Sequence, residues 1–206
     1  MEKEIEFNKI KKKINSIIDI PTKDIDFFLS KIVKKNILKG QLLIQQDEIA
    51  DFICYVNKGL FRTYLTRNGK EINTEFFFEN SFMSAFTSFL SEKPTALNIE
   101  ALEDSTLFYI SKSLLEDLYA INPVWFALGK HIFENEFIKK CKRESSFLQH
   151  NATERYLVLL QQYPLIETSV SLSHIASYLG IQPETLSRIR AGKFNELTYI
   201  KDNWNV

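Results

Sequence analysis

Residues 170–194 read VSLSHIASYLGIQPETLSRIRAGKF, a pattern typical of two short helices joined by a tight turn. Ser171 or Ser173 can cap the first helix, because a serine hydroxyl accepts from the first free backbone N–H groups. Gly180 permits the turn, and Pro183 suits the first position of a second helix. A glycine turn between short helices is typical of a helix-turn-helix, so this stretch predicts a DNA-binding unit.

The apolar residues of this stretch are spaced so that both helices can share one core. Four of them are expected to meet there, namely Ile175, Leu179, Leu186 and Ile189. Ala176 is small enough to let the second helix backbone approach closely. An alternative interpretation is a helical hairpin that only caps its domain, but the coincidence of cap, turn and outward polar residues favours the helix-turn-helix.

The polar face of the second helix carries residue types that suit base reading. Arginine can pair with guanine, glutamate can accept from the cytosine amino group, and hydroxyls can reach phosphate. Glu184, Thr185, Ser187 and Arg188 can reach a major groove from this face. The complete set of candidate DNA-binding residues is Ser173, Gln182, Glu184, Thr185, Ser187, Arg188, Arg190 and Lys193.

Overall charge gives no support for nucleic-acid binding. The chain of 206 residues has 26 Lys and Arg against 26 Asp and Glu, and residues 151–206 are balanced as well. A strongly basic chain would have indicated nucleic acid directly. Any basic footprint is therefore expected to be a small patch on one surface.

Cysteine and histidine usage predicts no cofactor and no metal. Cys54 and Cys141 are far apart and lack metal-ligand spacing, so a disulfide framework, a zinc site and an iron–sulfur cluster are not expected. The three histidines, at 131, 150 and 174, lie in helical segments and do not indicate haem ligation. A reducing compartment, the cytoplasm, fits this composition best.

The sequence predicts neither a membrane protein nor an enzyme. No apolar run approaches the length needed to span a bilayer, and the N-terminus MEKEIEFNKIKKK lacks the apolar region of a signal peptide. No nucleophile–base pair, phosphate loop or paired acid–base carboxylates are recognisable. We therefore expect no contact with a membrane and no catalytic residues.

The N-terminal half combines two helices with a β-rich region. Isoleucines at near-helical spacing predict a helix over residues 5–18, and a second is expected over 23–33. Residues 34–110 contain short β-rich runs separated by turn residues, which favours a compact β-roll. The pair Asn68-Gly69 between two such runs is a strong signal for a hairpin with a type I′ turn.

Residues 81–92 are predicted to form a short helix and loop inserted in this roll, where a ligand pocket would lie. The candidate effector pocket consists of Phe76, Phe82, Met83, Phe86 and Thr95. An aromatic cluster of this kind is also typical of ordinary core, and that alternative stays open.

The chain after residue 110 is expected to be helical. Residues 111–121 form one predicted helix, with Ser111 or Ser113 as its cap, and residues 123–150 form a second, much longer one. A helix of that length usually packs against another long helix, so we interpret it as a dimerisation helix. A helix internal to the core is the alternative, because a strict heptad pattern is not sustained.

Three stretches together resemble the Crp/Fnr-type bacterial transcription regulators. They are IASYLGIQPETLSRIR at 175–190, ALEDSTLFYIS at 101–111 and NATERYLVLLQQYP at 151–164. The resemblance covers nearly the whole chain. It implies base reading by Glu184 and Arg188, a phosphate contact by Thr185, and a homodimer on two-fold double-stranded DNA. RNA polymerase and an unknown small-molecule effector are further candidate partners.

The resemblance fails where members of the family bind cyclic AMP. Those members carry a Gly-Glu pair and then an arginine in the phosphate cassette, whereas this chain reads FENSFMSAFTSFLSEKPTALNIEAL at 78–102. Cyclic AMP is therefore not expected to control the protein. The tail AGKFNELTYIKDNWNV after Arg190 also departs from the family's β-hairpin wing, so Lys193 and the end of the second helix are expected to supply its phosphate contact.

These observations predict an α+β protein in three parts. Residues 1–122 form an antiparallel β-roll of the cyclic-nucleotide-binding-like jelly-roll type, 123–150 the dimerisation helix, and 151–206 an all-α helix-turn-helix domain. The predicted function is DNA-binding transcription regulation. The alternative is a small-molecule sensor whose helix-turn-helix is vestigial.

Overall fold

The computed structural model describes residues 2–192, and the chain divides into two compact units. The first comprises residues 1–65 and 74–139, and the second comprises 66–73 and 140–206. The boundary lies inside a long helix, between Lys139 and Lys140, and not at either end of the predicted dimerisation helix. The short piece 66–73 is the tip of a β-hairpin that begins and ends in the first unit.

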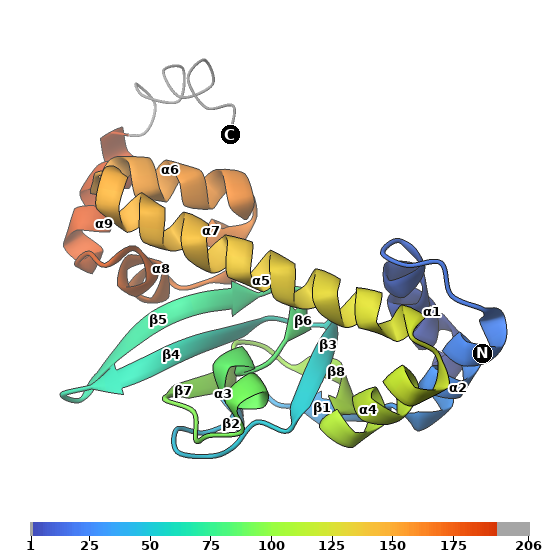
Figure 1. Cartoon of the computed structure of the whole chain (residues 1–206). Helices are drawn as coiled ribbons and strands as arrows, with labels where there is room; N and C mark the ends of the chain where they lie inside the picture. Colours follow the sequence, from blue (N-terminus) through green and yellow to red (C-terminus); the bar gives the residue numbers. More distant parts are fainter. Residues whose placement is uncertain (1, 193–206) are drawn as a thin grey trace. The chain divides into compact units, whose positions relative to one another are not determined.

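The first unit is an antiparallel β-roll built from two four-stranded sheets (Figure 1). One sheet has the order β1 (Val33–Ile37), β8 (Ser105–Ser111), β3 (Phe52–Lys58) and β6 (Phe82–Met83). The other has the order β2 (Leu42–Ile44), β7 (Leu97–Ala101), β4 (Phe61–Arg67) and β5 (Lys70–Phe77). This architecture confirms the α+β fold class and the antiparallel roll.

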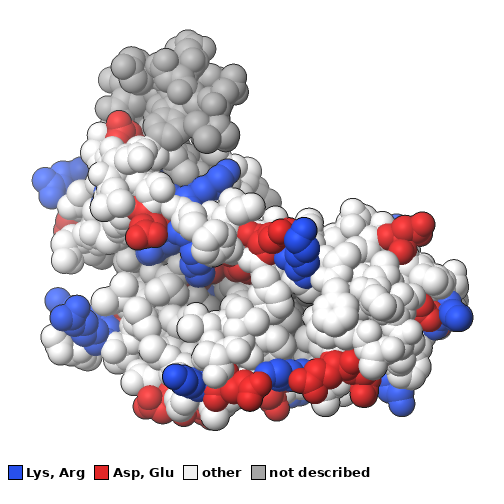
Figure 2. All heavy atoms as spheres, viewed as in Figure 1, with Lys and Arg blue, Asp and Glu red and all other residues white. Residues whose placement is uncertain are grey.

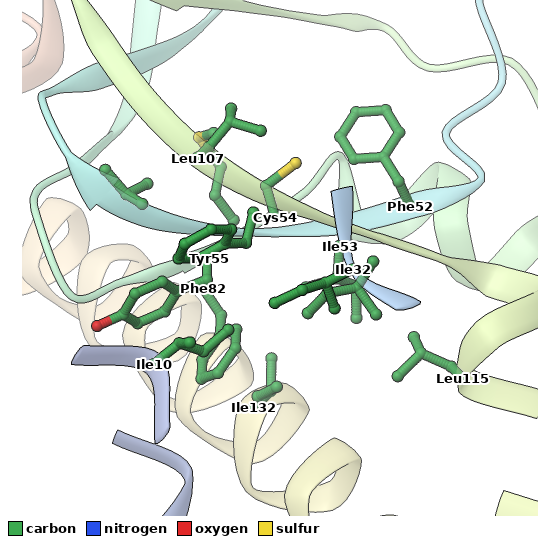
Figure 3. Close-up of a cluster of buried hydrophobic side chains, with 14 of the residues drawn as sticks. Ile10, Ile32, Phe52, Ile53, Cys54, Tyr55, Phe82, Leu107, Leu115 and Ile132 are labelled. Carbon is green, nitrogen blue, oxygen red and sulfur yellow. The ribbon is translucent and has the colours of Figure 1, made fainter. Parts of the chain in front are cut away.

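The core of the roll is apolar and rich in aromatic side chains. Tyr55 on β3 packs between Phe82 and Phe108, with ring centroids 5.5 and 6.4 Å away (Figure 3 labels Tyr55 and Phe82). Phe28 packs against Trp125 with a centroid separation of 5.2 Å. Burial of such large side chains is the main stabilising contribution to this unit.

Helices that precede and follow the strands in the chain pack against the roll, and one short helix is inserted between strands. α1 (Glu2–Asn15) packs on β3, and α2 (Thr22–Lys31) contributes Phe28 to the core. α4 (Lys112–Ile121) begins at the predicted cap, since the Ser111 hydroxyl accepts from the Leu114 N–H. α3 (Phe86–Ser91) lies within the predicted insertion, directly after the two-residue strand β6.

The prediction of a helix over residues 23–33 is wrong at its C-terminal end. Val33 already belongs to β1, where it pairs with Tyr109 of β8. The side chains at 33–36 are exposed, so no apolar alternation marks this strand in the sequence. Pairing with a strand far along the chain overrides the local helical pattern.

The Asn68-Gly69 turn has the conformation that the sequence predicted. Asn68 has φ +52° and Gly69 has φ +72°, and both are required to be positive in a type I′ turn. The hairpin β4–β5 is therefore tightly closed, and β5 forms one edge of its sheet.

α5 (Val124–Gln149) is the predicted long helix, and its 26 residues span about 39 Å at the usual helical rise. Trp125, Leu128 and Ile132 on one side are buried in the core of the roll. The last residues of α5 belong to the second unit, which continues with four further helices (Figure 1). These are α6 (Ala152–Gln162), α7 (Ile166–Ser169), α8 (Leu172–Leu179) and α9 (Pro183–Gly192).

No helix of the described chain is long and apolar enough to cross a membrane.

Candidate nucleic-acid interface

α8 and α9 form the predicted pair of short helices with a glycine turn. The Ser171 hydroxyl accepts from the His174 N–H at 3.3 Å, so Ser171 and not Ser173 is the cap of α8. Gly180 ends α8 with φ +70°, and the Ile181 N–H donates to the Ala176 carbonyl at 3.0 Å. This is the Schellman closure of a helix, which favours glycine because of the positive φ.

The turn also favours glycine because a side chain at this position would be too close to a neighbouring ring. A Cβ at position 180 would lie 2.9 Å from the ring of Phe147 at the end of α5. Ile175, Ala176 and Leu179 of α8 and Leu186 of α9 are buried together, whereas Ile189 is half-buried. The shared core predicted for the two helices is therefore present, with Ile189 at its margin.

Two arginines from other helices hold the C-terminal end of α8. Arg143 on α5 donates through Nη2 to the Tyr178 carbonyl at 3.0 Å, and Arg155 on α6 donates through Nε to the Leu179 carbonyl at 3.2 Å. Both guanidinium groups also stack on the ring of Phe147. Cations at a helix C-terminus satisfy its last carbonyls and stabilise its dipole, so these contacts fix the position of the turn.

α9 presents its polar residues on the side opposite Leu186. The Thr185 and Leu186 N–H groups both donate to the Gln182 carbonyl, which places Pro183 at the first helical position as predicted. Of the remaining candidates, Ser173, Gln182, Glu184, Ser187 and Arg188 are exposed, and Thr185 is half-buried. Lys193 lies outside the described residues. The exposed set can meet a major groove without moving a buried side chain.

Arg190 differs from the other candidates because its side chain is half-buried and paired with an acidic residue of the same unit. It lies one turn after Leu186, and its Nε donates to Glu167 Oε1 of α7 at 2.7 Å. The Tyr156 hydroxyl donates to the same carboxylate oxygen. Burial, followed by this hydrogen bond, raises the pKa of Tyr156, and the hydrogen bond to Glu167 raises the pKa of Arg190. Glu167 thus joins α6, α7 and α9.

Charge is dispersed over the face seen in Figure 2, where Lys and Arg alternate with Asp and Glu over the roll. This agrees with the equal numbers of acidic and basic residues in the chain. The roll therefore presents no large patch of one charge on this face.

Comparison with known proteins identifies the first unit. Residues 34–122 match the family model of the cyclic nucleotide-binding domain. The chain has the fold of solved Crp/Fnr regulators. No curated protein sequence matches the chain.

Several solved structures share this Crp/Fnr fold at low identity. FixK2 from Bradyrhizobium japonicum is 20% identical, with a TM-score of 0.68 over 78% of this chain and 83% of that one. A protein assigned to the Crp/Fnr family from Eubacterium rectale is 18% identical, with a TM-score of 0.66 over 87% and 86%. The c-di-GMP-responsive regulator CLP of Xanthomonas campestris is 15% identical, with a TM-score of 0.66 over 84% and 91%.

The region that matches the cyclic nucleotide-binding domain does not offer what a cyclic phosphate requires. Residues 79–96, which we call the β6–α3 segment, contain one cation, Lys93, and its side chain is exposed. The carboxylates of the segment pair elsewhere, Glu79 with Lys9 and Glu92 with Lys112. An anion buried here would lose its water without compensation, so the residues present do not fit a cyclic nucleotide.

The buried hydroxyls of the β6–α3 segment already have backbone partners. Ser84 donates to the Phe52 carbonyl at 2.6 Å, and Ser88 both donates to the Lys93 carbonyl and accepts from the Ala50 N–H. Thr95 accepts from the Leu97 N–H at 2.9 Å. In the neighbouring sheet, the buried Arg62 is paired with Glu100 through Nε at 2.8 Å.

The five residues predicted to line an effector pocket lie in or beside the β6–α3 segment of the roll. Phe82 lines a small apolar void together with Phe28, Trp125 and Leu128, but Phe76, Met83, Phe86 and Thr95 do not. Met83 is fully buried in β6, and Phe86 packs edge-on against Phe133 of α5. The effector pocket stays a prediction.

The residues that hold the helices of the second unit together were not predicted from the sequence. Arg143, Arg155 and Glu167 lie on three different helices, and each meets its partner only in the folded chain. The capping box of α6, in contrast, is local: Asn151 accepts from the Thr153 and Glu154 N–H groups, while Glu154 accepts from the Asn151 N–H. Such i to i+3 signals are local, whereas the arginine contacts are not.

Proposed function

We propose that this chain is a transcription regulator that binds double-stranded DNA through α9. The observation that supports this most directly is the outward polar face of α9, with Glu184, Ser187 and Arg188 exposed while Leu186 anchors the opposite side. In the proposed complex, Arg188 pairs with guanine and Glu184 accepts from cytosine. The hydroxyls of Thr185 and Ser187 reach the phosphates.

The proposed regulator acts as a homodimer through α5. One side of this helix, different from the side that carries Trp125, Leu128 and Ile132, carries Phe126, Phe137, Cys141 and Leu148, spaced 11, 4 and 7 residues apart. These spacings return to nearly the same side of a helix. Phe137 is 71% exposed and Leu148 is 81% exposed, which is unusual for such large apolar side chains in a stripe. A second copy of α5 would cover them.

A homodimer of this kind would bind a two-fold operator whose half-sites lie about one helical turn apart. The protein would act in the cytoplasm, where bacterial DNA lies. Its further protein partner at the operator would be RNA polymerase. We propose no cyclic-nucleotide control, because the β6–α3 segment contains no buried cation. We also propose no catalytic activity.

The experiment that tests DNA binding is selection of genomic fragments by the purified full-length protein without effector. Arg188→Ala is the test variant, and we expect its specific binding to weaken by about 1–3 kcal/mol while much of the nonspecific binding remains. Lys39→Ala is the control, because it removes an exposed side chain of the same charge in the first unit, outside α9 and the β4–β5 hairpin. The expected result is one two-fold motif recovered by the parent and the control.

Equal affinity of Arg188→Ala and the parent for the selected motif would contradict the role of Arg188. If the parent recovers no motif, the selection is repeated with a cell metabolite extract. Recovery then would indicate a required effector, and failure would favour the alternative of a sensor with a vestigial helix-turn-helix.

The dimer is tested by light scattering at micromolar concentration. Phe137→Glu together with Leu148→Glu should yield a folded monomer, because two charges in the apolar stripe oppose its burial. Glu116→Lys is the control, since Glu116 is exposed on α4 and lies outside the stripe. A monomeric parent would remove the two-fold operator from the proposal.

A further inference from the structure

The tip of the β4–β5 hairpin is part of the DNA-binding unit. β5 is an edge strand, so its outer N–H and C=O groups lack a neighbouring strand. The Ser177 hydroxyl of α8 meets two of them: it accepts from the Asn73 N–H at 3.0 Å and donates to the Glu71 carbonyl at 2.9 Å. One serine thus bonds to the strand edge as a neighbouring strand would.

The side chain of Asn73 extends this contact along α8. Its Nδ2 donates to the His174 carbonyl at 3.1 Å and lies 3.3 Å from His174 Nδ1. Asn73 is completely buried, although it lies near the tip of a hairpin. A buried amide is stable only with its hydrogen bonds made, so this position has a specific geometry and is not a loose surface contact.

A third element meets the same point. Arg143 of α5, whose Nη2 donates to the Tyr178 carbonyl, also approaches the Asn73 carbonyl at 3.5 Å, and its guanidinium stacks on the Tyr178 ring. The N-terminal and C-terminal parts of α8 are therefore held by different groups, Asn73 near His174 and Arg143 near Tyr178.

We propose that Asn73 and Ser177 are positioning residues for DNA binding: they hold α8, and through its turn α9, in the orientation that reads DNA. This inference rests on the proposed function. It also extends the DNA-binding unit beyond residues 151–206 to a hairpin whose strands begin in the cyclic nucleotide-binding domain. The conformation of that hairpin is then a determinant of DNA affinity.

The role is tested with the full-length dimer and a fragment selected by the parent. Asn73→Ala removes the amide contacts, Ser177→Ala removes the hydroxyl between Asn73 and Glu71, and Ser177→Thr keeps a hydroxyl. We expect each alanine variant to bind roughly three- to tenfold more weakly, as for the loss of a hydrogen bond, and Ser177→Thr to recover most of the affinity. Ser169→Ala is the matched control, since Ser169 is an exposed serine of the same unit.

Two further readouts separate positioning from direct contact and from simple destabilisation. The dependence of affinity on salt should stay unchanged in the alanine variants, because no phosphate contact is lost. Amide hydrogen exchange should become faster in α8 and stay unchanged in α6. Should Asn73→Ala fail to fold, Ser177→Ala, which alters only a half-buried hydroxyl, carries the test.

Faster exchange in α8 with unchanged DNA affinity would overturn the positioning role, because the contact would then be only structural. A reduced salt dependence would overturn it as well, by showing a direct phosphate contact. If the parent binds no DNA, the proposed function fails. If the parent binds and both alanine variants bind equally well, only this inference fails.

Discussion

The β6–α3 segment and α9 are two places where a regulator of this fold can meet a ligand, and here they differ in what their polar groups do. In the β6–α3 segment, the hydroxyls of Ser84 and Ser88 are buried and bonded to backbone. On α9, Glu184 and Arg188 are exposed. A polar group already bonded inside the protein gains little from a ligand, so we expect α9, and not the β6–α3 segment, to recognise another molecule.

The largest effect should come from truncating a buried core side chain of the β6–α3 segment. Phe82→Ala should lower the free energy of unfolding of the first unit by about 3–5 kcal/mol, because Phe82 packs on Tyr55 and its removal leaves a cavity. Urea unfolding measures this, and the exposed neighbour Leu90→Ala should change stability by less than about 0.5 kcal/mol. An unchanged free energy of unfolding in Phe82→Ala would contradict this prediction and would indicate that the segment can accommodate a cavity.

The next effect concerns base reading by α9. Glu184→Gln should lose about 1–3 kcal/mol of discrimination in favour of cytosine at one position of each half-site, since an amide can also donate to other bases. Selection with randomised DNA measures the preference at every position. Folding should not change, because Glu184 is exposed. A motif identical to that of the parent would show that Glu184 does not read a base.

A smaller effect is expected where α9 is anchored. Glu167→Gln removes the charge that pairs with Arg190, and we expect the second unit to lose about 0.5–1 kcal/mol of stability because the pair is partly exposed. Urea unfolding of Glu167→Gln is compared with Glu116→Gln, an exposed glutamate of the first unit. Equal stability of Glu167→Gln and the parent would show that the ion pair with Arg190 does not anchor α9.

The smallest expected effect is that of cyclic nucleotides on the first unit. A ligand present at a hundred times its Kd would raise the free energy of unfolding by about 2.7 kcal/mol. Cyclic AMP and cyclic GMP should produce no such rise in a thermal shift measurement, because the β6–α3 segment lacks a buried cation. A melting temperature that increases with nucleotide concentration would contradict the contrast between the two regions.

The sequence predicted correctly those features that depend only on residues close together in the chain. The serine cap of α4, the Asn68-Gly69 turn and the Gly180 turn all depend on residues within a few positions, and all three are present. β1 was misjudged at Val33 because its pairing partner Tyr109 lies far along the chain. The helix α7 was not predicted at all, although it carries Glu167.

The sequence by itself determined that two short helices with a glycine turn would expose Glu184 and Arg188, because helical periodicity and backbone sterics act over a few residues. Only the tertiary structure decided what orients those helices. Asn73, separated from Ser177 by 104 positions, meets it through hydrogen bonds that no spacing rule encodes. Such contacts arise when packing of the whole chain brings distant segments together and burial requires their polar groups to be satisfied.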